Sequence, residues 1–127
     1  MKLVPWAASM ATVLGGCGPD AQSLSKLSTI QSAIFTPKCA TSGCHGSVGT
    51  QAGLNLSQGQ SHGALVNIPS TVVLGATRVV PGDPNASLLF QAVNGTAPIQ
   101  RMPVGSSLAQ TDIDAISAWI EAGARDD

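Results

Sequence analysis

The chain has 127 residues, of which 10% are charged, and its formal net charge is −1. This length suits one compact domain rather than several. The six basic residues are scattered along the sequence, so they predict no positively charged face that could bind nucleic acid.

The first 16 residues are predicted to be a signal peptide. A lysine at position 2 precedes an uncharged, mostly apolar run from Leu3 to Gly16, which is too short to cross a bilayer as a helix. The run leads into L-G-G-C at residues 14 to 17, which resembles the lipobox of bacterial lipoproteins. The resemblance implies that Cys17 is acylated and becomes the first mature residue. The alternative is an ordinary secretory signal that is cut nearby.

Residues 17 to 27 are predicted to be the lipidated N-terminus and a polar linker, followed by one domain over residues 28 to 127. Ten residues of flexible linker span roughly 17 Å, so the domain would stay close to its membrane. If Cys17 carries lipid, Cys39 and Cys44 are the only other thiols, and free thiols do not persist in the oxidising envelope. The pair is then expected to attach a haem, close a disulfide or bind a metal.

The domain is predicted to consist of short helices joined by long loops. The first helix is expected to begin near Ser28, a good N-cap residue, and to end or bend at Thr36, because Pro37 disfavours helical geometry there. A glycine-rich loop follows. Ser57 is then expected to cap a short helix over residues 58 to 66.

The next helix is predicted to begin at Asp83-Pro84 and to stop at Asn94-Gly95, since Pro suits the first helical position and Gly the position after the last. A proline-bounded loop covers residues 96 to 105. Long loops in so small a domain are explained if they wrap a central cofactor.

The last helix is predicted over residues 109 to 122, with Gly123 at its C-terminal cap. Ala109 stands where a Ser or Thr cap would be expected. Its lack of a capping oxygen weakens the start of this helix by about 1 kcal/mol.

The stretch C-A-T-S-G-C-H-G, residues 39 to 46, contains the candidate residues for attaching a cofactor. The attachment signature of c-type haem is C-x-x-C-H, in which both cysteines form thioethers with the haem and the histidine becomes the proximal iron ligand. Here the spacer has four residues, so the two extra residues must loop outward. The adjacency of Cys44 and His45, the specific part of the signature, is preserved.

Two side chains are candidates for the second axial ligand of a haem iron. Met102 lies in the proline-bounded loop before the last helix, and a thioether ligand raises the reduction potential of the iron. Its ordinary alternative role is that of a core methionine that fills a gap. His62 is the other candidate, although its glycine-flanked segment suits an exposed polar side chain better.

Five segments cover nearly the whole predicted domain: I-F-T-P-K-C-A-T-S-G-C-H-G (34–46), G-L-N-L-S (53–57), V-V-P-G-D-P-N-A-S-L-L (79–89), R-M-P (101–103) and I-D-A-I-S-A-W-I-E-A-G-A (113–124). In these segments and their order the chain resembles the small cytochrome c domains of bacterial envelope proteins, the planctomycete-type cytochrome c family and related lipoproteins. The resemblance implies an all-α, cytochrome c-like fold around one covalent haem c. It also implies thioethers to Cys39 and Cys44, His45 as proximal ligand and Met102 as distal ligand.

The function implied by the resemblance is electron transfer rather than enzymatic catalysis. The protein would be a mono-haem c-type cytochrome lipoprotein on the periplasmic side of the bacterial envelope, anchored by lipid on Cys17 and exchanging single electrons with redox partner proteins. Two alternatives remain open. One is a haemless lipoprotein with a Cys39–Cys44 disulfide, acting as a binding or structural module. The other is a zinc or copper site of two cysteines and a histidine, which needs a fourth ligand.

Overall fold

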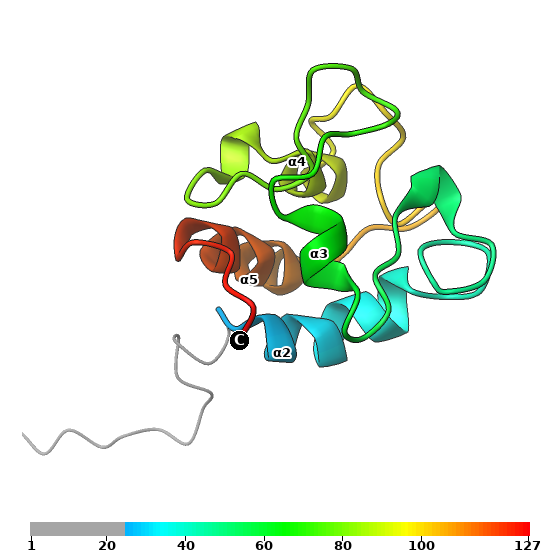
Figure 1. The fold of residues 1–127 in the computed structure, drawn as a ribbon, viewed down its shortest axis with the longest axis horizontal. Helices are drawn as coiled ribbons and strands as arrows, with labels where there is room; N and C mark the ends of the chain where they lie inside the picture. The colour runs from blue at the N-terminus through cyan, green and yellow to red at the C-terminus, as the bar shows by residue number, and fades with distance from the viewer. Residues whose placement is uncertain (1–24) are drawn as a thin grey trace, which may run out of the picture.

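The computed structural model describes residues 25–127 (Figure 1). The predicted signal peptide, residues 1–16, and Cys17 lie outside the described residues. About 42% of the described residues are helical, and no strand forms among them. The helices are α2 (Leu27–Ile30), η1 (Gln31–Cys39), η2 (Gln51–Gly53), α3 (Ser61–Leu65), η3 (Pro84–Ala86), α4 (Leu88–Asn94) and α5 (Gln110–Glu121).

The first helix is one continuous element in which α2 passes into the π-helical segment η1. Of the two outcomes expected at Thr36, an end of the helix is wrong, because the helix continues through Pro37 to Cys39 as a π-helix. The backbone N–H of Ala40 bonds to the carbonyl of Phe35, five residues back, at 2.6 Å. In an α-helix a proline ring crowds the carbonyl four residues back, and the wider π turn relieves that conflict.

The start of this helix is held by the other end of the chain. Lys26, not the predicted Ser28, is the N-cap residue, and its side chain makes no capping bond. Instead the N–H of Leu27 donates to Oδ1 of Asp127 at 3.1 Å, and the N–H of Ser28 donates to the carbonyl of Asp127 at 2.8 Å. Figure 1 shows the C-terminus beside the start of α2. Asp127 therefore satisfies two donors that a local cap would otherwise take.

The predicted short helix forms as α3, but it begins at Ser61 rather than near residue 58, and Ser57 does not cap it. The predicted start at Asp83 is correct, since its Oδ1 accepts the N–H of Ala86 at 3.1 Å. This turn, η3, is separated from α4 by the extended, fully buried Ser87. Gly95 ends α4 in the left-handed conformation, with φ of +81°, as predicted.

The helix α5 forms close to its predicted range, and Ala109 is its N-cap residue without a side-chain hydrogen bond, as predicted. Its apolar face packs on the first helix and on α4. The rings of Phe35 and Trp119, both fully buried, meet edge to face with centroids 6.5 Å apart. This contact fixes the first helix against α5 at the centre of the core. Long loops between the helices lie to the top and right of Figure 1.

Candidate functional site

An apolar cavity opens among these loops, between α3 and α4. Three of the four residues predicted to hold a haem line it: Cys39, His45 and Met102. It contains about 670 Å³ of space that protein atoms do not fill, counting its mouth. Aliphatic side chains form most of its wall, among them Leu54, Leu56, Leu65, Leu88, Leu89 and Val93. A flat apolar cofactor needs a cavity of this kind.

His45 is held in an orientation that suits a metal ligand. Its Nδ1 donates to the carbonyl oxygen of Leu54 at 3.2 Å, and because a carbonyl only accepts, the proton resides on Nδ1. Its Nε2 therefore keeps its lone pair free for a metal. The backbone is fixed as well, since the N–H of His45 donates to the carbonyl of Cys39 at 3.1 Å and the N–H of Leu56 donates to the carbonyl of His45 at 2.7 Å.

The four-residue spacer forms an outward turn. Thr41, Ser42 and Gly43 are exposed, as predicted, and the N–H of Cys44 donates to the carbonyl of Thr41 at 3.0 Å. The hydrogen bond from His45 to Cys39 closes the base of this turn. The extra residues are thus accommodated in solvent, without displacing His45 from the cavity wall.

Gly46 is a residue that the sequence reasoning missed. It is buried beneath the spacer, and a Cβ atom at this position would lie 2.9 Å from the carbonyl oxygen of Ala40. That atom belongs to the backbone and cannot swing aside. A glycine directly after the histidine was the available sequence signal, and the turn requires it.

The two cysteines differ in environment. Cys39 ends η1, is half-buried and lines the cavity, whereas Cys44 is exposed and does not line it. Burial raises the pKa of the Cys39 thiol to about 11, with Lys38 opposing the shift and Asp112 adding to it. Cys39 is therefore protonated at neutral pH.

The structure bears on both alternatives to haem attachment. Cys39 and Cys44 are free thiols, so the disulfide is not formed in this structure. Between residues 25 and 127 no three side chains of His, Cys, Asp or Glu gather to hold a metal ion. The described residues therefore lend no support to a zinc or copper site of two cysteines and a histidine.

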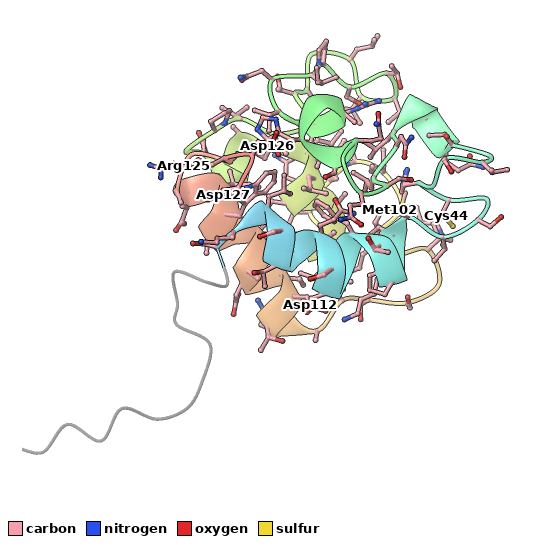
Figure 2. The ribbon with its side chains drawn as sticks, turned by 60° about the horizontal axis from the view of Figure 1, so that its bottom comes forward. Cys44, Met102, Asp112, Arg125, Asp126 and Asp127 are labelled. Atoms are coloured by element: carbon pink, nitrogen blue, oxygen red, sulfur yellow. The ribbon has the colours of Figure 1, made fainter. Side chains whose placement is uncertain are left out.

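Met102 reaches the cavity from the loop before α5. Its N–H donates to the carbonyl of Ala92 in α4 at 3.0 Å, and its half-buried side chain packs on the core. Figure 2 shows Met102 and Cys44 at the same end of the molecule. His62, the other candidate ligand, does not line this cavity. Its Nε2 donates to the carbonyl of Ala124 at 3.0 Å, which ties α3 to the C-terminal segment.

Arg78 is a second residue that the sequence reasoning missed. It is only 8% exposed and lines the mostly apolar cavity. No sequence signal marks it, because a lone arginine in an extended segment is usually a surface residue.

No protein family model, curated protein or solved structure matches this chain. The site itself must therefore indicate the chemistry. It combines a soft thioether sulfur and an imidazole nitrogen with a free lone pair, and a cysteine in the wall can form a covalent bond. This donor set suits iron in a haem, and the apolar wall suits its ring.

Proposed function

We propose that this protein is a mono-haem c-type cytochrome that carries single electrons in the bacterial envelope. The observation that supports the proposal most is the convergence of Cys39, His45 and Met102 on one apolar cavity. These residues come from the end of the first helix, the following turn and the loop before α5. His45 is close to Cys39 in sequence, but Met102 lies 57 residues after His45 (102 − 45), so only tertiary packing brings it to the same wall.

Two of the residues would attach the cofactor covalently and two would bind its iron. Cys39 and Cys44 would form the two thioether bonds, and the exposed turn between them provides slack for the longer spacer. Nε2 of His45 would be the proximal ligand and the sulfur of Met102 the distal ligand. When bound, haem supplies an iron that changes oxidation state by one electron.

The protein residues also set the environment of the iron. The hydrogen bond from Nδ1 of His45 to Leu54 fixes the ring and increases its basicity as a ligand. The aliphatic wall excludes water, which with a thioether ligand favours a high potential. If His45 and Met102 both bind the iron, no position on it would be left for a substrate. The arrangement therefore favours electron transfer over catalysis.

The proposed location is the periplasmic side of a bacterial membrane, with a lipid anchor on Cys17. This part rests on the sequence, because Cys17 and the apolar run before it lie outside the described residues. Among residues 25–127 no helix is long and apolar enough to cross a bilayer. A linker of roughly 17 Å would keep the cavity near membrane-bound redox partner proteins.

The deciding experiment is an alkaline pyridine absorption spectrum of denatured protein from cells with active c-type haem maturation. A haem spectrum that survives denaturation and acid–acetone extraction is expected. The Cys39→Ser, Cys44→Ser double variant should lose it, whereas His62→Ala is the matched control and should keep it. Absence of haem, together with a mass two hydrogens below that of the reduced chain, would instead establish a disulfide and overturn the proposal.

A further inference from the structure

Arg78 places a permanent positive charge in the wall of the cavity. Its Nη1 donates to the carbonyl of Ala64 at 3.0 Å and its Nη2 to the carbonyl of Ala52 at 2.9 Å. Both acceptors are neutral. Within the described part of the chain the one ion pair joins Lys38 and Asp112, so no described carboxylate neutralises Arg78.

A buried charge without a counter-charge destabilises the folded state, even where hydrogen bonds reduce the penalty. A guanidinium cannot escape by losing its proton, and its two carbonyl partners use only two of its five N–H donors. The charge of Arg78 and three of its N–H donors therefore have no partner among the described residues. An anionic group on a ligand in the cavity would supply what is missing.

The surrounding backbone holds the guanidinium in place. The carbonyl of Ala52 also accepts a hydrogen bond from Oγ1 of Thr71 at 3.0 Å, so two segments of the cavity rim meet at this oxygen. Ala52 adopts φ of +53°, a left-handed conformation that is unfavourable for alanine. Both Ala52 and Thr71 line the cavity. The hydrogen bonds to Ala52 and Ala64 hold the guanidinium at the cavity.

We propose that Arg78 binds a carboxylate on the ligand of this cavity, and that the ligand has an apolar body and at least one carboxylate. If the proposed function is correct, this carboxylate is a propionate of haem; only the identity of the ligand rests on that function. Among the described residues Arg78 is the only lysine or arginine in the cavity wall, so the ligand is expected to enter in the orientation that brings its carboxylate to Arg78. A bidentate contact with the planar guanidinium fixes orientation as well as affinity.

The test compares two porphyrins that differ only at their two carboxyl groups, which are free in one and methyl esters in the other. Iron mesoporphyrin IX has no vinyl groups and cannot form thioethers, and its dimethyl ester lacks both carboxylates. Full-length reduced chain, produced without haem maturation, is titrated with each porphyrin in the same detergent micelles, and the shift of the main absorption band is followed. Hydrogen bonds to charged groups contribute roughly 1.5–3 kcal/mol, so the wild type should bind the diacid at least about tenfold more tightly than the diester.

Variants then test whether Arg78 causes the preference for the diacid. Arg78→Met should bring the ratio of the two affinities close to one, and Arg78→Lys, which keeps the charge without the planar fork, should give an intermediate ratio. Lys38→Met is the matched control, because it removes a cation outside the cavity, and should leave the ratio unchanged. If Arg78→Met does not fold, the ratio of the two affinities in Arg78→Lys tests the proposal.

Equal affinity of the wild type for diacid and diester would overturn the role of Arg78 and leave the porphyrin cavity standing. A diacid preference that survives Arg78→Met and Arg78→Lys would overturn it as well. Binding of neither porphyrin to the wild type would contradict the proposed function itself, and the propionate contact with it.

Discussion

The N–H of Met102 donates to the carbonyl oxygen of Ala92 at 3.0 Å, and this bond fastens the loop before α5 to α4 at the cavity wall. The backbone of Met102 is therefore anchored to α4 at the cavity wall. This explains how a residue 63 positions after Cys39 (102 − 39) can serve the same cavity.

The first prediction concerns the sulfur of Met102. In haem-loaded protein Met102→Leu should lower the reduction potential and allow the reduced iron to bind carbon monoxide, because the thioether ligand is lost while the volume is kept. In the haemless chain the same change should cost less than about 1.5 kcal/mol of unfolding free energy, since it conserves volume. Spectroelectrochemistry and urea unfolding measure the two effects. An unchanged absorption spectrum in the loaded variant would remove Met102 from the distal position.

The second prediction separates the two histidines. His45→Ala should abolish the low-spin absorption spectrum of the loaded protein, because Nε2 of His45 is the proposed proximal ligand. His62→Ala should keep that spectrum and lower the unfolding free energy by about 1 kcal/mol, the typical contribution of one hydrogen bond, here the one to Ala124. If the spectrum followed His62 instead, the assignment of the cavity as the haem site would be wrong.

The third prediction tests the close packing beneath the spacer. Gly46→Ala would bring a methyl group to 2.9 Å from the carbonyl of Ala40, so the turn must shift and the folded state should lose roughly 1–3 kcal/mol. Gly63→Ala is the matched control. Gly63 lies inside α3 with no atom within 4 Å of the new Cβ, so alanine there should be neutral or stabilise by up to about 1 kcal/mol.

Urea unfolding of the haemless chain measures both glycine variants. Equal stability of the two would mean that the turn is loose enough to accept a side chain. The loop could then not hold His45 in a fixed orientation.

Several helix ends with local signals were predictable from sequence, although the cap predicted at Ser57 does not form. Asp83 and Gly95 act within one turn of their own position, and Ala109 lacks a capping oxygen as a property of its own side chain. The start of the first helix was not predictable in this way, because its capping group is Asp127, 100 residues later. Passage of the helix through Pro37 depends on a wider helical register, which a rule based on neighbouring residues does not include.

The candidate site shows the same division. The roles of Cys39, Cys44 and His45 could be predicted because the three residues form a motif of closely spaced positions. The cavity that joins Met102 to them is a product of tertiary packing, and sequence indicated it only through the order of resembling segments. The burial of Arg78 could not be predicted from the sequence, since it depends on the loops that pack over the side chain.

The last prediction follows from the burial of Cys39. In the folded chain its pKa is raised from 9.0 to about 11. Between these values the unfolded chain has lost the thiol proton while the folded chain still holds it, so the unfolded state binds fewer protons and stability must fall as pH rises. The contribution is present in full below about pH 9 and disappears through about pH 11. Two pKa units correspond to at most about 3 kcal/mol.

The comparison of reduced, haemless wild type with Cys39→Ala isolates this effect, because every other titrating group is common to both chains. The advantage of the wild type in unfolding free energy should shrink between pH 9 and pH 11 and be constant at lower pH. Iodoacetamide should alkylate the exposed Cys44 first at pH 8, because Cys39 is half-buried and protonated there. A difference that stays constant up to pH 11.5, with both cysteines alkylated at one rate, would mean that Cys39 faces solvent. In that case it could not present its sulfur to a ligand in the cavity.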